Sequence, residues 1–146
     1  ILKERLVMKI LIFGLPGSGK TWLAERLQKE LGCAWFNADQ VRTMSNDWDF
    51  SEDGRLRQSN RMKNLADFEH KFGRIVICDF VCPTEHTRKS FDADYTIWLD
   101  TIDAGRFADT NKIFEKPNKV DYHISQWFDD THVQLAEIIK RRIINV

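Results

Sequence analysis

The sequence predicts an α/β fold: a three-layer α/β/α sandwich around a mostly parallel five-stranded sheet. Two apolar runs, at residues 8–13 and within residues 74–81, have the composition of strands that are buried on both faces. Segments with helical spacing of apolar residues alternate with the expected strands, and this alternation is typical of right-handed βαβ crossovers. The chain has 146 residues, and we expect a single domain over residues 1–146.

The first half of the chain is expected to hold two strands and three helices. After the strand at residues 8–13, leucines at positions 23, 27 and 31 have helical spacing, and Gly32 is a favoured C-cap. Residues 34–37 are apolar and β-prone, a short helix follows at residues 40–44, and a polar loop covers residues 47–54. A longer helix at residues 55–72 ends at Gly73. Its apolar stripe comprises Leu56, Met62, Leu65, Ala66, Phe68 and Phe72.

The second half is expected to hold three strands and two helices. A strand within residues 74–81 ends before Pro83, and Thr84 can cap a short helix that reaches about residue 91. Further strands are expected at residues 95–99 and 120–125, with a polar, basic stretch at residues 103–119 between them. The C-terminal helix at residues 131–144 is amphipathic. Its inward positions are expected to be Val133, Leu135, Ile138, Ile139 and Ile143.

Charge and cysteine content limit the classes of partner and compartment. Basic and acidic residues number 22 each, so the bulk charge gives no support for a membrane or nucleic-acid partner. No apolar stretch is long enough to cross a bilayer and no signal-peptide layout is present, so we expect a soluble, cytoplasmic protein. The three cysteines fit neither a metal site nor a disulfide framework, which favours a reducing compartment. The first methionine is Met8, and we expect residues 1–7 to be an upstream extension.

The most informative motif lies between the first strand and the first helix. The octapeptide Gly14-Leu15-Pro16-Gly17-Ser18-Gly19-Lys20-Thr21 matches G-x-x-x-x-G-K-[ST]. Its glycines let successive N–H groups point inward, and the helix N-terminus adds partial positive charge. We expect Lys20 to reach the β- and γ-phosphates of a nucleoside triphosphate and the Thr21 hydroxyl to hold Mg²⁺. The alternative is a glycine-rich turn that binds no ligand.

Carboxylates follow three of the expected strands. They lie at the edge of the sheet where residues 14–21, here called the phosphate loop, are expected. Asp39 could accept the proton of an acceptor hydroxyl or hold a metal-bound water; its alternative role is to cap the helix at residues 40–44. Asp79 ends a buried strand and resembles a Walker B aspartate that binds Mg²⁺ through water; its alternative is a capping or salt-bridging role. Asp100 is a third candidate of this kind.

Residues 105–117, here called the lid segment, mix cations with polar residues directly after a strand. A segment in this place could close over the phosphates and exclude water, with Arg106 or Lys112 neutralising transition-state charge. The alternative is a solvated loop without a specific role.

Several blocks of this sequence resemble the adenylylsulfate (APS) kinase family. Residues 36–42, 48–55 and 60–61 are similar to the family's patterns L-D-G-D-N-[IV]-R, L-G-F-S, D-R and N-I-R-R. Residues 79–83 stand where the family has F-I-S-P, and residues 109–114 are similar to its lid, R-D-x-K-G-L-Y. The resemblance runs in one order from residue 8 to the C-terminal helix.

The resemblance implies a P-loop NTPase-type fold and transfer of the ATP γ-phosphate to the 3′-hydroxyl of APS, which gives PAPS and ADP. It implies catalytic roles for Lys20 and Asp39, and it places Lys112 in the lid. Acceptor-binding residues implied by the resemblance are Asp39, Arg42, Phe50, Arg55, Arg61, Val81, Cys82, Pro83 and Phe114.

This sequence departs from the family pattern on the acceptor side. Gln40 and Gln58 each stand where the family has Asn, and Cys82 stands where it has Ser. The family's segment T-G-I-D-x-P-Y-E-x-P, which walls the acceptor site, is reduced here to residues 115–119. Two alternatives therefore stay open: a kinase for another nucleoside, a polynucleotide end or a small metabolite, and a nucleotide-binding regulatory domain that uses Trp127 and Phe128 on a partner surface. The sequence also leaves open whether the chain forms a homodimer.

Overall fold

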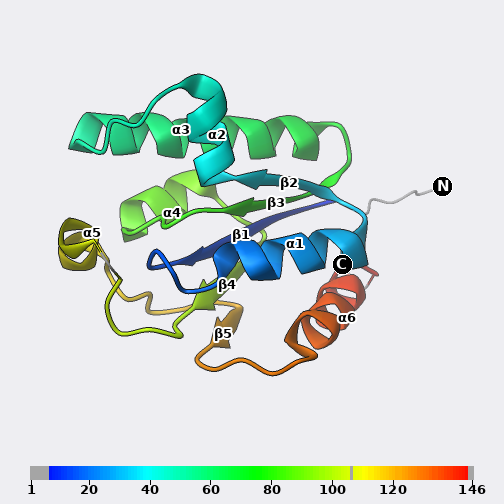
Figure 1. The fold of residues 1–146 in the computed structure, drawn as a ribbon. Helices are drawn as coiled ribbons and strands as arrows, with labels where there is room; N and C mark the ends of the chain where they lie inside the picture. Colours follow the sequence, from blue (N-terminus) through cyan, green and yellow to red (C-terminus); the bar gives the residue numbers. More distant parts are fainter. Residues whose placement is uncertain (1–6, 106, 145–146) are drawn as a thin grey trace.

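A five-stranded parallel sheet forms the middle layer of the computed structural model, which describes residues 7–105 and 107–144 (Figure 1). The strands are β1 (Met8–Gly14), β2 (Ala34–Asn37), β3 (Ile75–Asp79), β4 (Tyr95–Leu99) and β5 (Tyr122–Ile124). Their order is β2-β3-β1-β4-β5, and each neighbouring pair is parallel. The predicted α/β sandwich with a parallel five-stranded sheet is confirmed.

Helices cover both faces of the sheet, and a separate apolar core lies under each layer. One core joins Ile10 and Ile12 of β1 to α1 (Lys20–Leu31) and α6 (Thr131–Ile144). The other joins Leu11 and Phe13 to α3 (Glu52–Lys71) and α4 (Glu85–Phe91). Side chains alternate between the faces along a strand, so burial of both faces requires the continuous apolar run of β1.

Two short helices lie at the carboxyl end of the sheet. Helix α2 (Ala38–Ser45) links β2 to α3, and α5 (Ala108–Ile113) forms within the lid segment. Figure 1 shows α5 at the same end of the sheet as the loop between β1 and α1. None of the helices described between residues 7 and 144 combines the length and apolar composition that a bilayer crossing requires.

Helix α3 differs from its prediction at both ends. It begins at Glu52 because the Ser51 hydroxyl accepts a hydrogen bond from the Gly54 N–H, so the polar loop is shorter than predicted. Met62 and Ala66 are buried, but three residues of the predicted apolar stripe are exposed. The exposed fractions are 48% for Leu56, 59% for Phe68 and 65% for Phe72. Because 20 helical residues span about 30 Å and the five residues of β3 only about 17 Å, the helix extends past the sheet.

Helix α6 has a narrower buried stripe than the sequence predicts. Leu135 and Ile139 are buried and Ile143 packs against the same core. Val133 and Ile138 were expected to point inward, and the structure leaves them 43% and 38% exposed. These two residues lie on either side of the stripe, where the single helix face in contact with the sheet does not reach them.

All three cysteines are buried free thiols, and we expect them to make the fold sensitive to alkali. Burial raises the pKa of Cys33 and of Cys82 from 9.0 to about 12, and it raises the pKa of Cys78 as well. Above pH 9 the thiols ionise in the unfolded chain but stay neutral in the fold, so stability present below pH 9 is lost as pH rises. The expected loss is about 1.4 kcal/mol per pH unit for each thiol.

Urea unfolding at a series of pH values measures this loss. The variant Cys33→Ala should fall less steeply with pH than the unmodified chain. Equal slopes for the two proteins would show that Cys33 does not titrate differently in the folded and unfolded states.

Candidate functional site

The loop between β1 and α1 is a tight backbone turn held from two sides. The Ser18 N–H donates to the Leu15 carbonyl at 3.1 Å, and the Thr101 hydroxyl donates to the Ser18 carbonyl at 2.8 Å. Gly19 has φ 103°, and a Cβ at this position would overlap the indole of Trp127. Only glycine fits here, because both the backbone angle and the space exclude a side chain.

Two polar side chains of this loop, Lys20 and Ser18, are buried beside its backbone and suit an anion. The Lys20 ammonium donates to the Leu15 carbonyl at 3.0 Å. Burial lowers the pKa of Lys20 from 10.5 to about 8, while the charges of Asp79 and Asp39 act in the opposite direction. The Ser18 hydroxyl is buried and has no hydrogen-bond partner among the described residues. A phosphate bound in the loop would compensate the desolvated cation and add an acceptor.

Thr21 and Asp79 meet at the carboxyl ends of β1 and β3. The Thr21 hydroxyl donates to Asp79 Oδ2 at 3.4 Å, and Asn37 Nδ2 donates to Asp79 Oδ1 at 3.0 Å and to Thr21 Oγ1 at 3.1 Å. The Trp35 indole N–H donates to the same carboxylate at 3.3 Å. Burial raises the pKa of Asp79 to about 6, against these hydrogen bonds and the charge of Lys20, which lower it.

The oxygen atoms of Thr21 and Asp79 fit a hard cation such as Mg²⁺. Within residues 7–105 and 107–144, no group of three or more His, Cys, Asp or Glu side chains is placed to hold a metal ion. A Mg²⁺ ion at this site would therefore take its other ligands from nucleotide oxygens and water, as this ion commonly does in nucleotide-binding proteins.

Asp39 lies in the first turn of α2 with an exposed side chain. The N-cap of this helix is Asn37, whose side-chain oxygen accepts the Gln40 N–H at 3.0 Å, so the alternative role of Asp39 as the cap is wrong. Asn37 thus contacts Asp79 and Thr21 with its nitrogen and caps α2 with its oxygen. One buried amide therefore joins Thr21 and Asp79 to the helix that carries Asp39.

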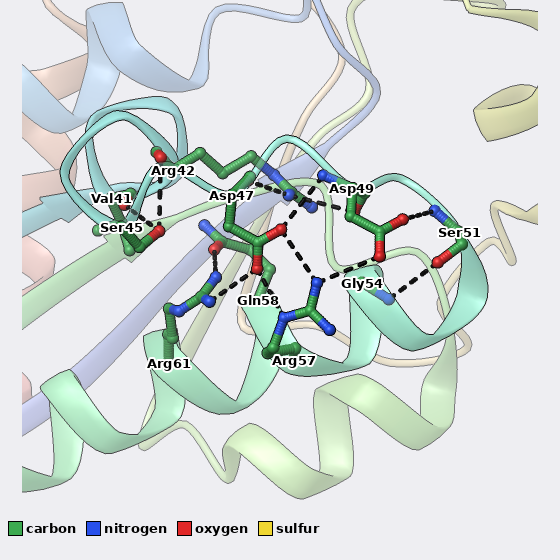
Figure 2. Close-up of polar contacts among 10 residues, drawn as sticks. All are labelled: Val41, Arg42, Ser45, Asp47, Asp49, Ser51, Gly54, Arg57, Gln58 and Arg61. Atoms are coloured by element: carbon green, nitrogen blue, oxygen red, sulfur yellow. Dashed lines mark hydrogen bonds and ion pairs between the residues drawn. The ribbon is translucent and has the colours of Figure 1, made fainter.

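The loop from α2 to α3 packs around Arg42, which Figure 2 shows beside Asp47 and Asp49, and it also brings Phe50 against the Arg42 guanidinium. The buried Arg42 guanidinium donates to the carbonyls of Asp47 at 2.7 Å and Asp49 at 3.3 Å. It lies 4.3 Å from the centroid of the Phe50 ring, which is 56% exposed. Burial lowers the pKa of Arg42. Arg42 therefore stabilises the loop, while more than half of the Phe50 side chain stays exposed to solvent.

Asp47 lies between two arginines of α3, as Figure 2 shows. It accepts hydrogen bonds from Arg57 Nε at 2.6 Å and from Arg61 Nη2 at 2.7 Å, and these bonds hold the pKa of its carboxyl below the usual range. Arg61 also donates to Gln58 at 3.1 Å. The charge of Arg61 is thus already paired within the protein, whereas Arg55 lies half-buried in the first turn of α3.

The segment after β3 and the end of the lid segment lie against each other. The Glu115 N–H donates to the Pro83 carbonyl at 2.7 Å. Phe114 stacks on Phe13 with 6.5 Å between the ring centroids. Cys82 is buried with φ 43°, and its thiol lies 3.6 Å from the Thr87 hydroxyl. The structure therefore brings Cys82, Pro83 and Phe114 to one wall, with Val81 half-buried beside them.

The lid segment begins beside the phosphate loop. A Cβ on Gly105 would lie 3.1 Å from the Pro16 carbonyl oxygen. Asn111 accepts the Gly105 N–H at 2.8 Å and donates to the Gly105 carbonyl at 2.9 Å, which ties α5 to the start of the segment. Lys112 is exposed on α5, and Arg106 lies outside the described residues.

Sequence reasoning missed Trp35 and Asn37 as partners of Asp79, and it missed Trp127 as a cover of the phosphate loop. The Trp127 ring lies 5.0 Å from that of Trp22, which in turn lies 5.7 Å from His132. The pairing of Trp22 and Trp127 has no sequence signature, because 105 positions separate them and the packing of α6 against α1 brings them together.

Comparison with known proteins agrees with this geometry. The family model of adenylylsulphate kinase matches residues 7–99. A probable adenylyl-sulfate kinase from Aeropyrum pernix is 36% identical over 84 residues, which cover 51% of this chain and 44% of that protein. An adenylyl-sulfate kinase from Pseudomonas entomophila is 36% identical over 81 residues, with coverage of 51% and 39%. The chain spans less than half the length of these curated relatives.

Solved structures with the same fold include the APS kinase of Mycobacterium tuberculosis in complex with AMPPNP and APS. It has a TM-score of 0.76 and 16% identity, and the match covers 98% of this chain and 100% of that one. A hexameric APS kinase from Thiobacillus denitrificans has a TM-score of 0.76 and 24% identity over 95% of this chain and 29% of its own. At these identities the structures establish the shared fold, and the family model, which matches more than half of the chain, establishes the kinship. The chain belongs to the adenylylsulfate kinase family.

Proposed function

We propose that this chain is an ATP-dependent kinase that transfers the γ-phosphate to the 3′-hydroxyl of adenylylsulfate. The observation that carries the proposal is the convergence of two groups of residues at one end of the sheet. Lys20, Thr21 and Asp79 form a donor side, and the helix that carries Asp39 is joined to it through Asn37. Family membership adds support, as does the related structure solved with AMPPNP and APS.

On the donor side, the N–H groups of residues 14–21 would bind the phosphates, and Lys20 would extend from the Leu15 carbonyl to the β- and γ-phosphates. Thr21 and Asp79 would hold Mg²⁺, which when bound neutralises charge on the phosphate oxygens. Lys112, exposed on α5 of the lid segment, would neutralise charge on the phosphates, and the segment would exclude water from them.

On the acceptor side, Asp39 would accept the proton of the attacking hydroxyl. Phe50 would stack on the base, and Arg42, Arg55 and Arg61 would attract the anionic group of the acceptor. The wall of Val81, Cys82, Pro83 and Phe114 would close the opposite side. Because Arg61 is paired with Asp47 in this structure, an anionic acceptor would have to compete with that carboxylate.

Incubation of the protein with [γ-³²P]ATP, Mg²⁺ and APS tests the proposal directly. The expected product is labelled PAPS with an equal amount of ADP. Nucleosides, oligonucleotide ends and small hydroxylated metabolites would be screened in parallel, since the post-lid segment is short. If another acceptor is preferred over APS, the substrate assignment is wrong. If nucleotide binds tightly but no acceptor increases ADP release, the chain is a nucleotide-binding regulatory domain and not a kinase.

The variant Phe50→Ala is expected to raise the KM for APS about 10-fold and leave the KM for ATP unchanged, because base stacking on an aromatic ring contributes about 1–3 kcal/mol. Steady-state kinetics with each substrate varied measures both constants. Phe68→Ala is the matched control. The Phe68 side chain is 59% exposed, against 56% for Phe50, and it lies toward the C-terminal end of α3, away from the loop that carries Phe50. Equal effects of the two substitutions on the KM for APS would show that Phe50 is not part of the acceptor site.

A further inference from the structure

Arg88 is a buried cation outside every motif discussed above. It lies in α4, and its side chain is only 7% exposed. A buried arginine is costly unless its donors are satisfied, so its partners show what the residue does.

The guanidinium donates to three backbone carbonyls from two distant segments. Arg88 Nε donates to Cys82 at 2.9 Å, and Nη2 donates to Pro83 at 3.1 Å and to Glu115 at 2.6 Å. Nη1 completes the set with the Glu85 carboxylate at 2.7 Å. The first two carbonyls follow β3, and the third follows the lid segment's last aromatic residue. One side chain therefore ties together two stretches of chain that are about 30 residues apart in sequence.

The same guanidinium lies against two aromatic rings. Its central carbon is 4.5 Å from the centroid of Phe13 and 5.1 Å from that of Phe114. Phe13 directly precedes Gly14, the first residue of the phosphate loop. Arg88 thus also sets the position of the Phe114 side chain relative to the end of β1.

Two of the residues that Arg88 binds have further unusual features: Cys82 has a strained backbone conformation, and Glu115 forms further hydrogen bonds to the segment after β3. Cys82 has φ 43°, a conformation uncommon outside glycine, and its carbonyl is the one that Arg88 Nε holds. The Glu115 N–H donates to Pro83, and the Glu115 carboxylate accepts the Glu85 N–H at 3.0 Å. Carbonyls in different directions need the planar fork of arginine, which a lysine ammonium on the same stem cannot reproduce.

We propose that Arg88 is the positioning residue of the acceptor site. It fixes the residues after β3, Cys82 and Pro83, against the end of the lid segment at Phe114 and Glu115, so that the wall they form is rigid on one side of the acceptor. This inference rests on the proposed function, because it assigns these residues to the acceptor side. Arg88 itself touches neither substrate.

Kinetics of Arg88→Met and Arg88→Lys test the inference, with Lys89→Met, an exposed neighbour on the same helix, as the control. In Arg88→Met, the KM for APS is expected to rise at least 10-fold, while the KM for ATP and the Kd for ADP stay within twofold. Arg88→Lys is expected to lie between this variant and the unmodified chain. Equal changes in the constants for ATP and APS would reduce Arg88 to a general structural role, and unchanged constants would overturn the inference.

Limited proteolysis gives a readout that needs no acceptor. Lys112 and Lys119 are exposed trypsin sites on either side of the end of the lid segment. With ADP bound, we expect cleavage at these sites to be at least fivefold faster in Arg88→Lys than in Lys89→Met, with unchanged cleavage at sites outside residues 88 and 89. If the unmodified protein does not phosphorylate APS but this difference is present, the substrate assignment fails and the positioning role stands. Cleavage at equal rates in both variants would contradict the positioning role whatever the acceptor is.

Discussion

Replacement of Lys20 by alanine is expected to lower kcat/KM for phosphate transfer at least about 100-fold, the usual cost of removing one preorganised charge from a polar transition state. Lys20 is the cation of the phosphate loop, and its pKa is lowered to about 8 by burial. The protein alone therefore compensates the positive charge of Lys20 only in part, and a bound anion would stabilise it. The measurement is APS-dependent ADP release for the variant, with Lys29→Ala, an exposed lysine in the last turn of α1, as the control.

The stability of Lys20→Ala separates this loss from misfolding. Because the folded pKa of about 8 lies below the ordinary value of 10.5, the unfolded chain binds more protons than the fold between these two pH values. The free energy of unfolding should therefore rise with pH across this window in the unmodified chain, relative to Lys20→Ala. At pH 7 the variant should be at least as stable. A variant that loses activity only because it unfolds at pH 7 would contradict a catalytic role.

Replacement of Asp39 by asparagine is expected to lower kcat about 100-fold or more, the usual contribution of a positioned general base. Asp39 lies at the start of α2, is not needed as the helix cap, and is close enough to Lys20 to raise its pKa. Binding of ATP should be unchanged, because the hydrogen bonds of Lys20 to Leu15 and of Thr21 to Asp79 do not involve Asp39. Single-turnover kinetics with saturating ATP and APS measure the chemical step.

Asp53→Asn is the matched control for Asp39→Asn, since Asp53 is an exposed acid in the first turn of α3. Both substitutions remove a favourable charge at a helix N-terminus, so both should lower stability by less than about 1 kcal/mol. Only Asp39→Asn should slow transfer. If the two variants have the same kcat, Asp39 contributes to the helix and not to the reaction.

The placement of residues 14–21 could be predicted closely from the sequence because these residues are contiguous. Residues 14–21 follow an apolar strand and open a helix, and this order alone places them at the carboxyl end of the sheet. The position of Asp79 beside Thr21 followed from a second buried run, since the ends of neighbouring parallel strands meet at one edge.

The residues that support the site could not be predicted, because their partners are distant in sequence. Arg88 and Glu115 meet only through the folded lid segment, and Trp35 reaches Asp79 only because β2 pairs with β3. The spacing of apolar residues also does not show how far the sheet extends beneath α3. Phe72 was therefore predicted to be in the core, although the core ends before this residue. Helix α5 was missed because a six-residue helix has too few apolar positions to define a period.

A structure of the protein with ADP and APS bound would show whether the phosphate loop and the loop after α2 are the two halves of one site. We expect the ADP phosphates on the N–H groups of residues 14–21 and the adenine of APS stacked on Phe50. The anionic group of APS should lie near Arg42 and Arg55, and its 3′-hydroxyl should lie within hydrogen-bond distance of Asp39. An acceptor bound elsewhere, with Phe50 free and Asp39 facing solvent, would contradict this expectation.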